Sequence, residues 1–241
     1  ARHGHRVTVY ERDPAPPEGN ADAAFFEWQR LGAAQFRHPH AFLGLMCNLL
    51  RDNYPDLLDA FYAAGARRVG FEDMLPPQLK ANYQPEPGDD RYWVLLCRRA
   101  TMETVIRRYV ETLPNVTIRN RVHVVGLLTE ARDGALVATG IEIRDRADET
   151  AGNEAVHADL VIDASGRGTR FPAMLRQLGR EVREETEDAE IIYYTRHYRL
   201  KEGQSEPARG DNRGAGDLGY LKYGVFPGDN GHFAIILCVP D

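Results

Sequence analysis

An acidic residue at the end of the first predicted strand is a candidate for binding chemistry. The run Arg6-Val7-Thr8-Val9-Tyr10 has the composition of a short strand, and Glu11 follows it directly. In dinucleotide-binding folds, the second parallel strand ends in a carboxylate that accepts hydrogen bonds from the adenosine ribose hydroxyls. Glu11 stands where that role requires an acid. Strands also end in glutamate by chance, so both interpretations remain open at this point.

The usual companion of such an acid is a glycine-rich phosphate loop that precedes it by about 20 residues. Only ten residues precede Glu11, so we expect the first strand and this loop to be absent from the chain. Residues 214–219 do spell GxGxxG, but they follow a polar loop and lead into a predicted strand. Backbone N–H groups hold a pyrophosphate only where the loop opens a helix, so we reject this match.

Arginines at two places could hold phosphate or flavin groups. The first place is the loop Gln35-Phe36-Arg37-His38-Pro39-His40, before a helical pattern at 41–52. The second is Cys97-Arg98-Arg99, before an amphipathic helix predicted at 101–113. A fixed guanidinium offsets phosphate charge through charge-assisted hydrogen bonds. The alternative is that the arginine pair is only the solvated start of a helix.

A glycine turn late in the chain is a third candidate. Residues 158–163 read as a short, deeply buried strand of the parallel kind, which runs into Ala164-Ser165-Gly166-Arg167-Gly168. A short helix is expected at 171–178. The end of such a strand can bring Asp163, Ala164 and Gly166 close to a bound cofactor.

The elements that would position these residues change in type along the chain. Helices are expected at 41–52, 55–65 and 101–113, with an irregular, proline-rich stretch at 66–91. Strands are expected at 92–96, 116–118, 122–129 and 136–144, with a hairpin turn at Asp133-Gly134. Polar loops are expected at 148–154 and 202–217, and strands at 191–200, 218–226 and 232–239. The chain should therefore combine an α/β part with an antiparallel β part.

Composition narrows the function classes. The 241 residues have a net charge of −6, with no basic block, which argues against nucleic acid as a partner. Only three of the 30 basic residues are lysines, a bias that fits either phosphate recognition or codon usage. The three cysteines are far apart, as in a reducing compartment, and no apolar run suits a membrane span. We expect a cytoplasmic protein.

Two other chemistries find little support. His38 and His40 lie close together, but no nearby acid or cysteine completes a familiar metal-site spacing. The GxSxG nucleophile elbow of serine hydrolases is missing from the sequence. We therefore expect neither a metal centre nor a Ser/His/Asp hydrolase.

Taken together, four motifs resemble FAD-dependent monooxygenases of the para-hydroxybenzoate hydroxylase type. They occur in the order that this group shows, over residues 4–170. They are Gly4–Asp13 after the phosphate loop, the arginine loop Gln35–Ala41, Cys97-Arg98-Arg99 with Thr101-Met102-Glu103, and the strand and glycine turn at Ala158–Gly168. Related geranylgeranyl-reductase-like and flavin-halogenase-like proteins share this pattern.

The resemblance implies a role for each matching position. Glu11 would bind the adenosine ribose, and Arg12 would lie near the adenine. Arg37 would reach the flavin side, and Arg99 the pyrophosphate or ribityl chain. The remaining implied cofactor-binding residues are Val124, through its backbone at the adenine pocket, and Asp163, Ala164 and Gly166 at the strand end. No catalytic side chain is implied, since the flavin carries the reaction chemistry.

The resemblance also implies the fold: a parallel-sheet, Rossmann-like FAD-binding domain (1–69 and 97–187) interleaved with an antiparallel-sheet substrate domain (70–96 and 188–241), incomplete at both termini. The later Gly-Asp motif of the group would lie beyond Asp241. The implied activity is flavin-dependent oxidation, foremost monooxygenation, of an apolar or aromatic small molecule, with NAD(P)H as a possible electron donor. The oligomeric state is not encoded in any motif.

Two departures from the group keep alternatives open. The hydroxylases carry Asp-Gly at the last turn, whereas this chain has Ser165-Gly166. That variant resembles flavin halogenases, lycopene-cyclase-like proteins and geranylgeranyl-reductase-like proteins. The halogenase Trp-x-Trp-x-Ile-Pro signature is missing, because the only tryptophans are Trp28 and Trp93. A flavin-dependent reductase or cyclase of an isoprenoid, and a non-catalytic domain that binds no cofactor, remain as the two alternatives.

Overall fold

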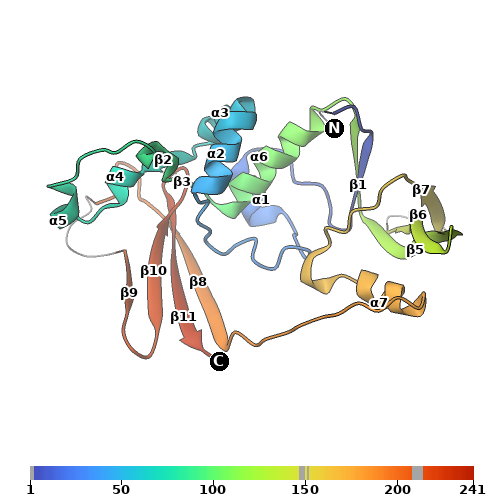
Figure 1. The fold of residues 1–241 in the computed structure, drawn as a ribbon. Coiled ribbons are helices and arrows are strands. Elements are labelled where there is room, and N and C mark those ends of the chain that lie inside the picture. Colours follow the sequence, from blue (N-terminus) through green and yellow to red (C-terminus); the bar gives the residue numbers. More distant parts are fainter. Residues whose placement is uncertain (1–2, 147–149, 151, 208–213) are drawn as a thin grey trace. The chain divides into compact units, whose positions relative to one another are not determined.

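The computed structural model describes residues 3–146, 150, 152–207 and 214–241, and its chain divides into two compact units. The first unit comprises Ala1–Pro16, Trp28–Ala34 and Leu113–Asp188. The second comprises Pro17–Glu27, Gln35–Thr112 and Ala189–Asp241. The chain passes between them several times, so each unit joins segments that are far apart in the sequence (Figure 1). The functional domain boundaries predicted above stay a prediction.

The first unit contains the parallel pairing that a dinucleotide-binding fold requires. Strand β1 (Val7–Glu11) pairs in parallel with β4 (Val116–Asn120), so that Glu11 lies opposite Asn120. An antiparallel sheet follows in the order β5 (Val122–Arg132), β6 (Ala135–Asp145) and β7 (Glu154–His157). Asp133 and Gly134 both have positive φ, 50° and 77°, which suits the tight turn of a right-twisted hairpin. The predicted hairpin is confirmed.

One predicted strand of this unit is wrong. Residues 158–163 form no strand, and Leu160 and Ile162 are 73% and 78% exposed. A strand is stabilised by backbone hydrogen bonds to a neighbour, and no described strand pairs with this segment. Leu160 and Ile162 therefore have no sheet face to bury against, whereas Val161 packs against the core of this unit. The turn at Gly166–Gly168 and the helix α7 (Phe171–Gln177) follow close to their expected positions.

Four longer helices lie together in the second unit (Figure 1). They are α1 (Ala21–Glu27), α2 (Gly44–Asn53), α3 (Pro55–Ala63) and α6 (Arg99–Glu111). Pro55 is the first residue of α3, where its fixed φ suits the helix and its missing N–H costs nothing. Helix α6 begins at Arg99, two residues before the predicted start. The buried core of this unit consists of Cys47, Leu50, Leu57, Leu58, Phe61, Ala66, Trp93, Leu95, Cys97 and Met102.

The stretch expected to be irregular at 66–91 contains short elements. Strand β2 (Arg67–Gly70) pairs with β3 (Trp93–Leu96), and between them lie α4 (Phe71–Met74), α5 (Pro77–Lys80) and a 3-10 turn at Asp89–Arg91. Elements this short have weak sequence periodicity, because four residues complete only one helical turn.

An antiparallel sheet completes the second unit. Its order is β8 (Ile191–Arg199), β11 (His232–Pro240), β10 (Lys222–Pro227) and β9 (Ala215–Asp217). The rejected GxGxxG run at 214–219 thus contributes an edge strand of this sheet. The molecule therefore combines α/β and antiparallel β structure, as predicted. In the described ranges, no helix is long and apolar enough to cross a lipid bilayer.

Candidate functional site

Glu11 lies in a small polar cluster at the end of β1. Its Oε2 atom lies 2.8 Å from Nη1 of Arg30, and its Oε1 accepts the backbone N–H of Asp13 at 3.0 Å. The same guanidinium nitrogen lies 2.9 Å from Oδ2 of Asp13, which also accepts the N–H of Gly32 at 2.8 Å. Arg30 therefore bridges two carboxylates where the strand ends.

The carboxylate of Glu11 fits the ribose role that the resemblance implies. An ionised carboxylate has about four acceptor positions, and the contacts above occupy two of them. Arg12 donates from Nη2 to the Leu31 carbonyl at 3.3 Å, so its guanidinium is held against the segment that carries Arg30. Asp13, which is 3% exposed, was not singled out from the sequence, although it lies two residues after Glu11. Nothing in the sequence indicated that Asp13 is buried, because an acid directly before a proline is typical of an exposed loop.

The other predicted residues of the first unit lie near one core. Val124 on β5 packs against the buried cluster Val122, Ile141 and Ile143, together with Tyr10 and Val161. Tyr10 directly precedes Glu11, and Val161 lies two residues before Asp163. The core thus gathers the neighbours of Glu11 and Asp163 around Val124, and Val124 itself has the contacts of an ordinary core residue.

Asp163 organises its own turn. Its Oδ1 accepts the Ser165 N–H at 2.9 Å and the Ser165 hydroxyl at 2.6 Å, and its Oδ2 accepts the Thr169 hydroxyl. Burial raises the pKa of this carboxyl, but the hydrogen bonds from Ser165 and Thr169 outweigh burial and hold the pKa below its usual value. Gly166 takes φ +77°, a conformation that glycine adopts without strain. Ala164 and Gly166 are both exposed.

Arg37, in the second unit, caps a helix. Its Nε and Nη2 donate to the carbonyls of Phe25 and Phe26 at 2.9 and 3.4 Å, near the C-terminal end of α1. The last carbonyls of a helix lack intrahelical partners, so a guanidinium stabilises them. The backbone carbonyl of Arg37 in turn accepts a hydrogen bond from Nε2 of His197 on β8. Arg37 therefore has a structural role in addition to the flavin contact that the resemblance implies.

Arg99 is held from two sides at the start of α6. Its Nε lies 2.7 Å from Oε1 of Glu103, one helical turn along. Its Nη1 lies 3.3 Å from Nε2 of His40, whose Nδ1 lies 2.8 Å from the His38 carbonyl. Carbonyl oxygens only accept, so the His40 proton is on Nδ1 and its Nε2 accepts from Arg99. Nη2 of Arg99 has no hydrogen-bond partner among the described residues and remains available to a ligand.

Arg98, the neighbour of Arg99, has a different environment. It is 5% exposed, and its Nη2 lies 2.6 Å from Oδ2 of the fully buried Asp229 and 2.5 Å from Oδ1 of Asp22. Its backbone N–H also donates to Asp229 at 2.7 Å. Burial raises the pKa of Asp229, but the hydrogen bonds and charge of Arg98 outweigh burial and hold the pKa below its usual value. The carboxylate therefore stays charged. The sequence could not distinguish the two arginines, because both are expected at a helix start.

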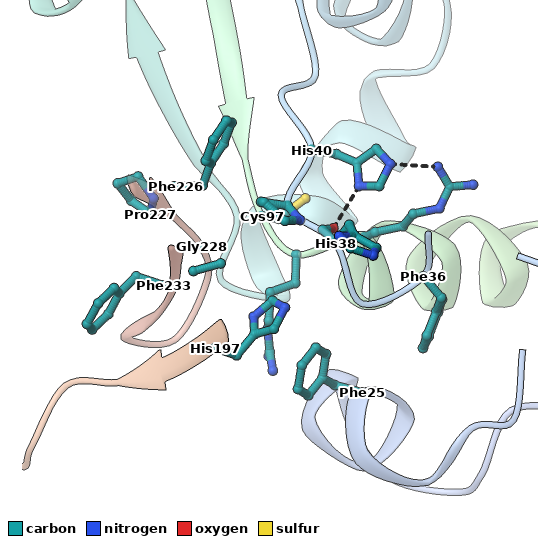
Figure 2. Close-up of a pocket in the computed structure, with 14 residues that line it drawn as sticks. Phe25, Phe36, His38, His40, Cys97, His197, Phe226, Pro227, Gly228 and Phe233 are labelled. Atoms are coloured by element: carbon teal, nitrogen blue, oxygen red, sulfur yellow. Dashed lines mark hydrogen bonds between the residues drawn. The ribbon is translucent and has the colours of Figure 1, made fainter. Parts of the chain in front are cut away.

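A small cavity of about 20 Å³ lies beside these residues (Figure 2). In Figure 2, phenylalanine rings surround the imidazoles of His38, His40 and His197. His38 is held by Thr195, whose hydroxyl lies 2.8 Å from Nδ1 of the imidazole. Thr195 and His197 are two residues apart on β8, so both project from the same face of the sheet. Within the described residues, no group of three acids, histidines or cysteines could hold a metal ion.

The predicted residues are thus divided between the two units. The first unit holds Glu11, Arg12, Val124, Asp163, Ala164 and Gly166, and the second holds Arg37 and Arg99. Within the second unit, His40 connects the loop that carries Arg37 to the guanidinium of Arg99. His40 itself was considered from the sequence only as a metal ligand.

Comparison with known proteins shows which proteins this chain resembles. No family model matches the chain. Protein Rv3254 of Mycobacterium tuberculosis is 30% identical over 207 residues, which make up 82% of this chain and 40% of that protein. The chain therefore spans about two fifths of the length of this curated relative.

Two solved structures resemble nearly the whole chain. PqsL, a probable FAD-dependent monooxygenase from Pseudomonas aeruginosa, has a TM-score of 0.64 at 13% identity, over 99% of this chain and 55% of that chain. p-Nitrophenol 4-monooxygenase PnpA from Pseudomonas putida DLL-E4 has a TM-score of 0.58 at 15% identity. This similarity covers 100% of this chain and 52% of the PnpA chain. The chain has the fold of the FAD-dependent monooxygenases. PqsL has also been solved in complex with 2-aminobenzoylacetate.

This FAD-monooxygenase fold confirms the predicted resemblance at the level of structure. The predicted interleaving of a cofactor domain with a substrate domain, and the predicted role of each site residue, stay predictions.

Proposed function

We propose that the protein binds FAD and oxidises an apolar or aromatic small molecule, foremost by monooxygenation. The fold shared with PqsL and PnpA supports this proposal. The names of the PqsL ligand and of the PnpA substrate both describe compounds with a benzene ring. The exposed tyrosines of the β8 strand, Tyr193, Tyr194 and Tyr198, offer aromatic surface on the sheet proposed to hold substrate.

The observation that carries the proposal is the arrangement of Arg99. Its guanidinium is held at the first residue of α6 by His40 and Glu103, with Nη2 available to a ligand. The helix start adds partial positive charge from its unpaired N–H groups. A fixed, partly exposed cation at a helix start suits the FAD pyrophosphate or ribityl chain.

In the first unit, Glu11 is the residue proposed to contact the adenosine part of FAD. Its remaining acceptor positions at the end of β1 suit the adenosine ribose hydroxyls, with Arg12 near the adenine. Val124, Asp163, Ala164 and Gly166 would approach the cofactor mainly through their backbone. When bound, the flavin supplies the redox chemistry, and the protein supplies position, charge and exclusion of water.

The first test is an absorption spectrum of the full-length protein that contains this chain. Flavin bands in the purified protein, or after addition of FAD and removal of excess, support the proposal. Oxidation of NADPH or NADH that depends on a small aromatic compound then identifies the electron donor. A colourless protein that takes up no added FAD contradicts the proposal and favours the non-catalytic alternative.

A second candidate function rests on Ser165. Its hydroxyl and N–H both bond to Asp163, so the turn places a neutral side chain where the hydroxylases have an acid. This variant favours a flavin-dependent reductase or cyclase that acts on an isoprenoid substrate. Oxygen consumption distinguishes the two candidates, because monooxygenation consumes O₂ in proportion to product and reduction or cyclisation does not.

A further inference from the structure

A small cavity is lined by Arg98 and His197, and each of these residues has a buried polar atom with no hydrogen-bond partner among the described residues. Its volume is about 20 Å³, and it lies within the second unit. The residues that line it are Phe25, Phe36, His38, Pro39, His40, Cys97, Arg98, Arg99, His197, Phe226, Pro227, Gly228, Phe233 and Ala234. Most of this lining is apolar or already hydrogen-bonded, so the exceptions determine what the cavity can hold.

The first exception is a donor. Arg98 is 5% exposed, and Asp229 and Asp22 occupy its Nε and Nη2 atoms. Its Nη1 atom is buried and has no hydrogen-bond partner among the described residues. A buried guanidinium N–H without an acceptor loses its hydration and gains nothing in return. An acceptor is therefore expected beside Nη1.

The second exception is an acceptor. His197 donates from Nε2 to the Arg37 carbonyl, which fixes the proton on that nitrogen and leaves a lone pair on Nδ1. Nδ1 is also buried and has no partner among the described residues. Burial lowers the pKa of His197 and the nearby Arg98 charge lowers it further, so the ring is neutral at pH 7. The edge-on contact with Phe25, 4.7 Å between ring centroids, holds the imidazole in place.

These two atoms need a ligand that can both accept and donate a hydrogen bond. The cavity volume exceeds the roughly 10–15 Å³ that one water needs, so it suits a single small ligand. A chloride ion could accept from Arg98 but would face the lone pair of His197. We propose that this cavity binds one buried water molecule, which accepts a hydrogen bond from Nη1 of Arg98 and donates one to Nδ1 of His197.

The water would connect three elements of the second unit. It would join β8, through His197, to the start of α6 at Arg98, and Asp229 extends this link to the turn between β10 and β11. It would also lie one residue from Arg99, the proposed phosphate-binding residue. This inference does not depend on flavin binding, and its test needs no cofactor.

A high-resolution crystal structure of the full-length protein tests the proposal directly. One ordered water within hydrogen-bond distance of both atoms is expected. An empty cavity, or a direct hydrogen bond between Arg98 and His197, overturns it. Crystals grown with bromide in place of chloride address the alternative ligand, since an anomalous peak in the cavity would identify a halide and also overturn the proposal.

A solution measurement gives independent evidence. Oxygen-17 magnetic relaxation dispersion counts the long-lived internal waters of a protein. The His197→Phe variant removes the acceptor and should lower this count by one. The His38→Asn variant keeps an acceptor for Thr195 at the same cavity and should leave the count unchanged. An equal count in the wild type and His197→Phe would contradict the proposal.

Discussion

At the scale of single residues, two neighbouring arginines have different surroundings. Arg98 is buried between Asp22 and Asp229, whereas the side chain of Arg99 is 27% exposed and keeps Nη2 available. The difference arises because consecutive residues at a helix start project in different directions. Arg98 stabilises the unit, and Arg99 is the one suited to a ligand.

Replacement of Arg99 should weaken FAD binding without unfolding the protein. A charge-assisted hydrogen bond contributes about 1.5–3 kcal/mol, so Arg99→Met should lower FAD affinity roughly 10- to 100-fold. The loss of its half-buried i,i+4 pair with Glu103 should change stability by about 1 kcal/mol. Flavin fluorescence titration of the full-length protein measures the affinity. Arg107→Met is the control, because Arg107 makes the same kind of pair with Glu111 on the same helix. Equal affinities for both variants would contradict the role of Arg99.

His40 should make FAD affinity sensitive to acid. Burial lowers the pKa of His40 from 6.5, and the charge of Arg99 lowers it further, while Glu103 and the His38 carbonyl raise it. The ring is thus neutral at pH 7 and accepts from Arg99, and below its pKa it becomes a cation that repels Arg99. His40→Gln keeps an acceptor that does not titrate, so the loss of affinity in acid should diminish. Affinity measured across the acid range in both proteins checks this, and identical pH profiles would refute it.

At the scale of elements, the turn between β10 and β11 is joined to the start of α6 by a buried ion pair. Asp229 is fully buried and accepts from the backbone and side chain of Arg98. Neither charge can be solvated, so each depends on the other. The sequence contains no sign of this pair, because its members are separated by 131 positions.

Breaking this pair should strongly destabilise the second unit. Asp229→Asn leaves Arg98 with only Asp22 as a counter-charge, and the expected loss is about 3–5 kcal/mol. Urea unfolding of the purified protein measures the change. Asp217→Asn, which affects an exposed pair with Lys222, should change stability by less than about 1 kcal/mol. Similar losses for the two variants would show that burial does not decide the effect.

The β6–β7 pairing depends on the lack of a side chain at Gly140. A Cβ atom there would lie 2.1 Å from the Val156 carbonyl oxygen on β7. Gly140→Ala should therefore push β7 away and cost about 1–3 kcal/mol. At Gly126 the nearest atoms are Cβ and Oε2 of Glu142, both at 3.1 Å, so Gly126→Ala needs a much smaller shift and should be tolerated better. Hydrogen exchange at β7 amides reports the change, and equal protection in both variants would contradict it.

At the scale of the whole molecule, buried and half-buried histidines should make the protein sensitive to acid. Burial is the largest cause that lowers the pKa of His40, His123, His197 and His232. The folded state then binds fewer protons than the unfolded chain at pH values just below 6.5. This contribution to stability is present above that pH and is lost as the pH falls. The carboxylates of Asp22, Asp163 and Asp229 change the stability only at lower pH, because their pKa values lie below 3.8.

The free energy of unfolding should therefore decrease between neutral pH and about pH 5. Each histidine adds a slope of at most about 1.4 kcal/mol per pH unit. Urea unfolding at several pH values measures the slope, and replacement of His197 by phenylalanine should reduce it. A flat profile over this range would show that the four rings are not held neutral by the fold.

The sequence by itself determined the local structure and the superfamily resemblance. The strands with alternating apolar and polar residues, the helix that begins at Pro55 and the Asp133-Gly134 turn follow from local conformational preferences. Such preferences depend on residues that are close together in the sequence. The motif around Glu11 and the arginines before two helices predicted an FAD-monooxygenase fold, which the structural comparison confirmed.

Only the tertiary structure decided how individual side chains are used. It showed that Arg98 is buried with Asp229, that His40 contacts Arg99, and that His197 and Arg98 share a cavity. These contacts join residues 59 to 131 positions apart, and no local pattern encodes them. The wrongly predicted strand at 158–163 has the same cause. Its apolar composition favours a strand, but a strand also needs a neighbour to pair with, and pairing is decided by the fold as a whole.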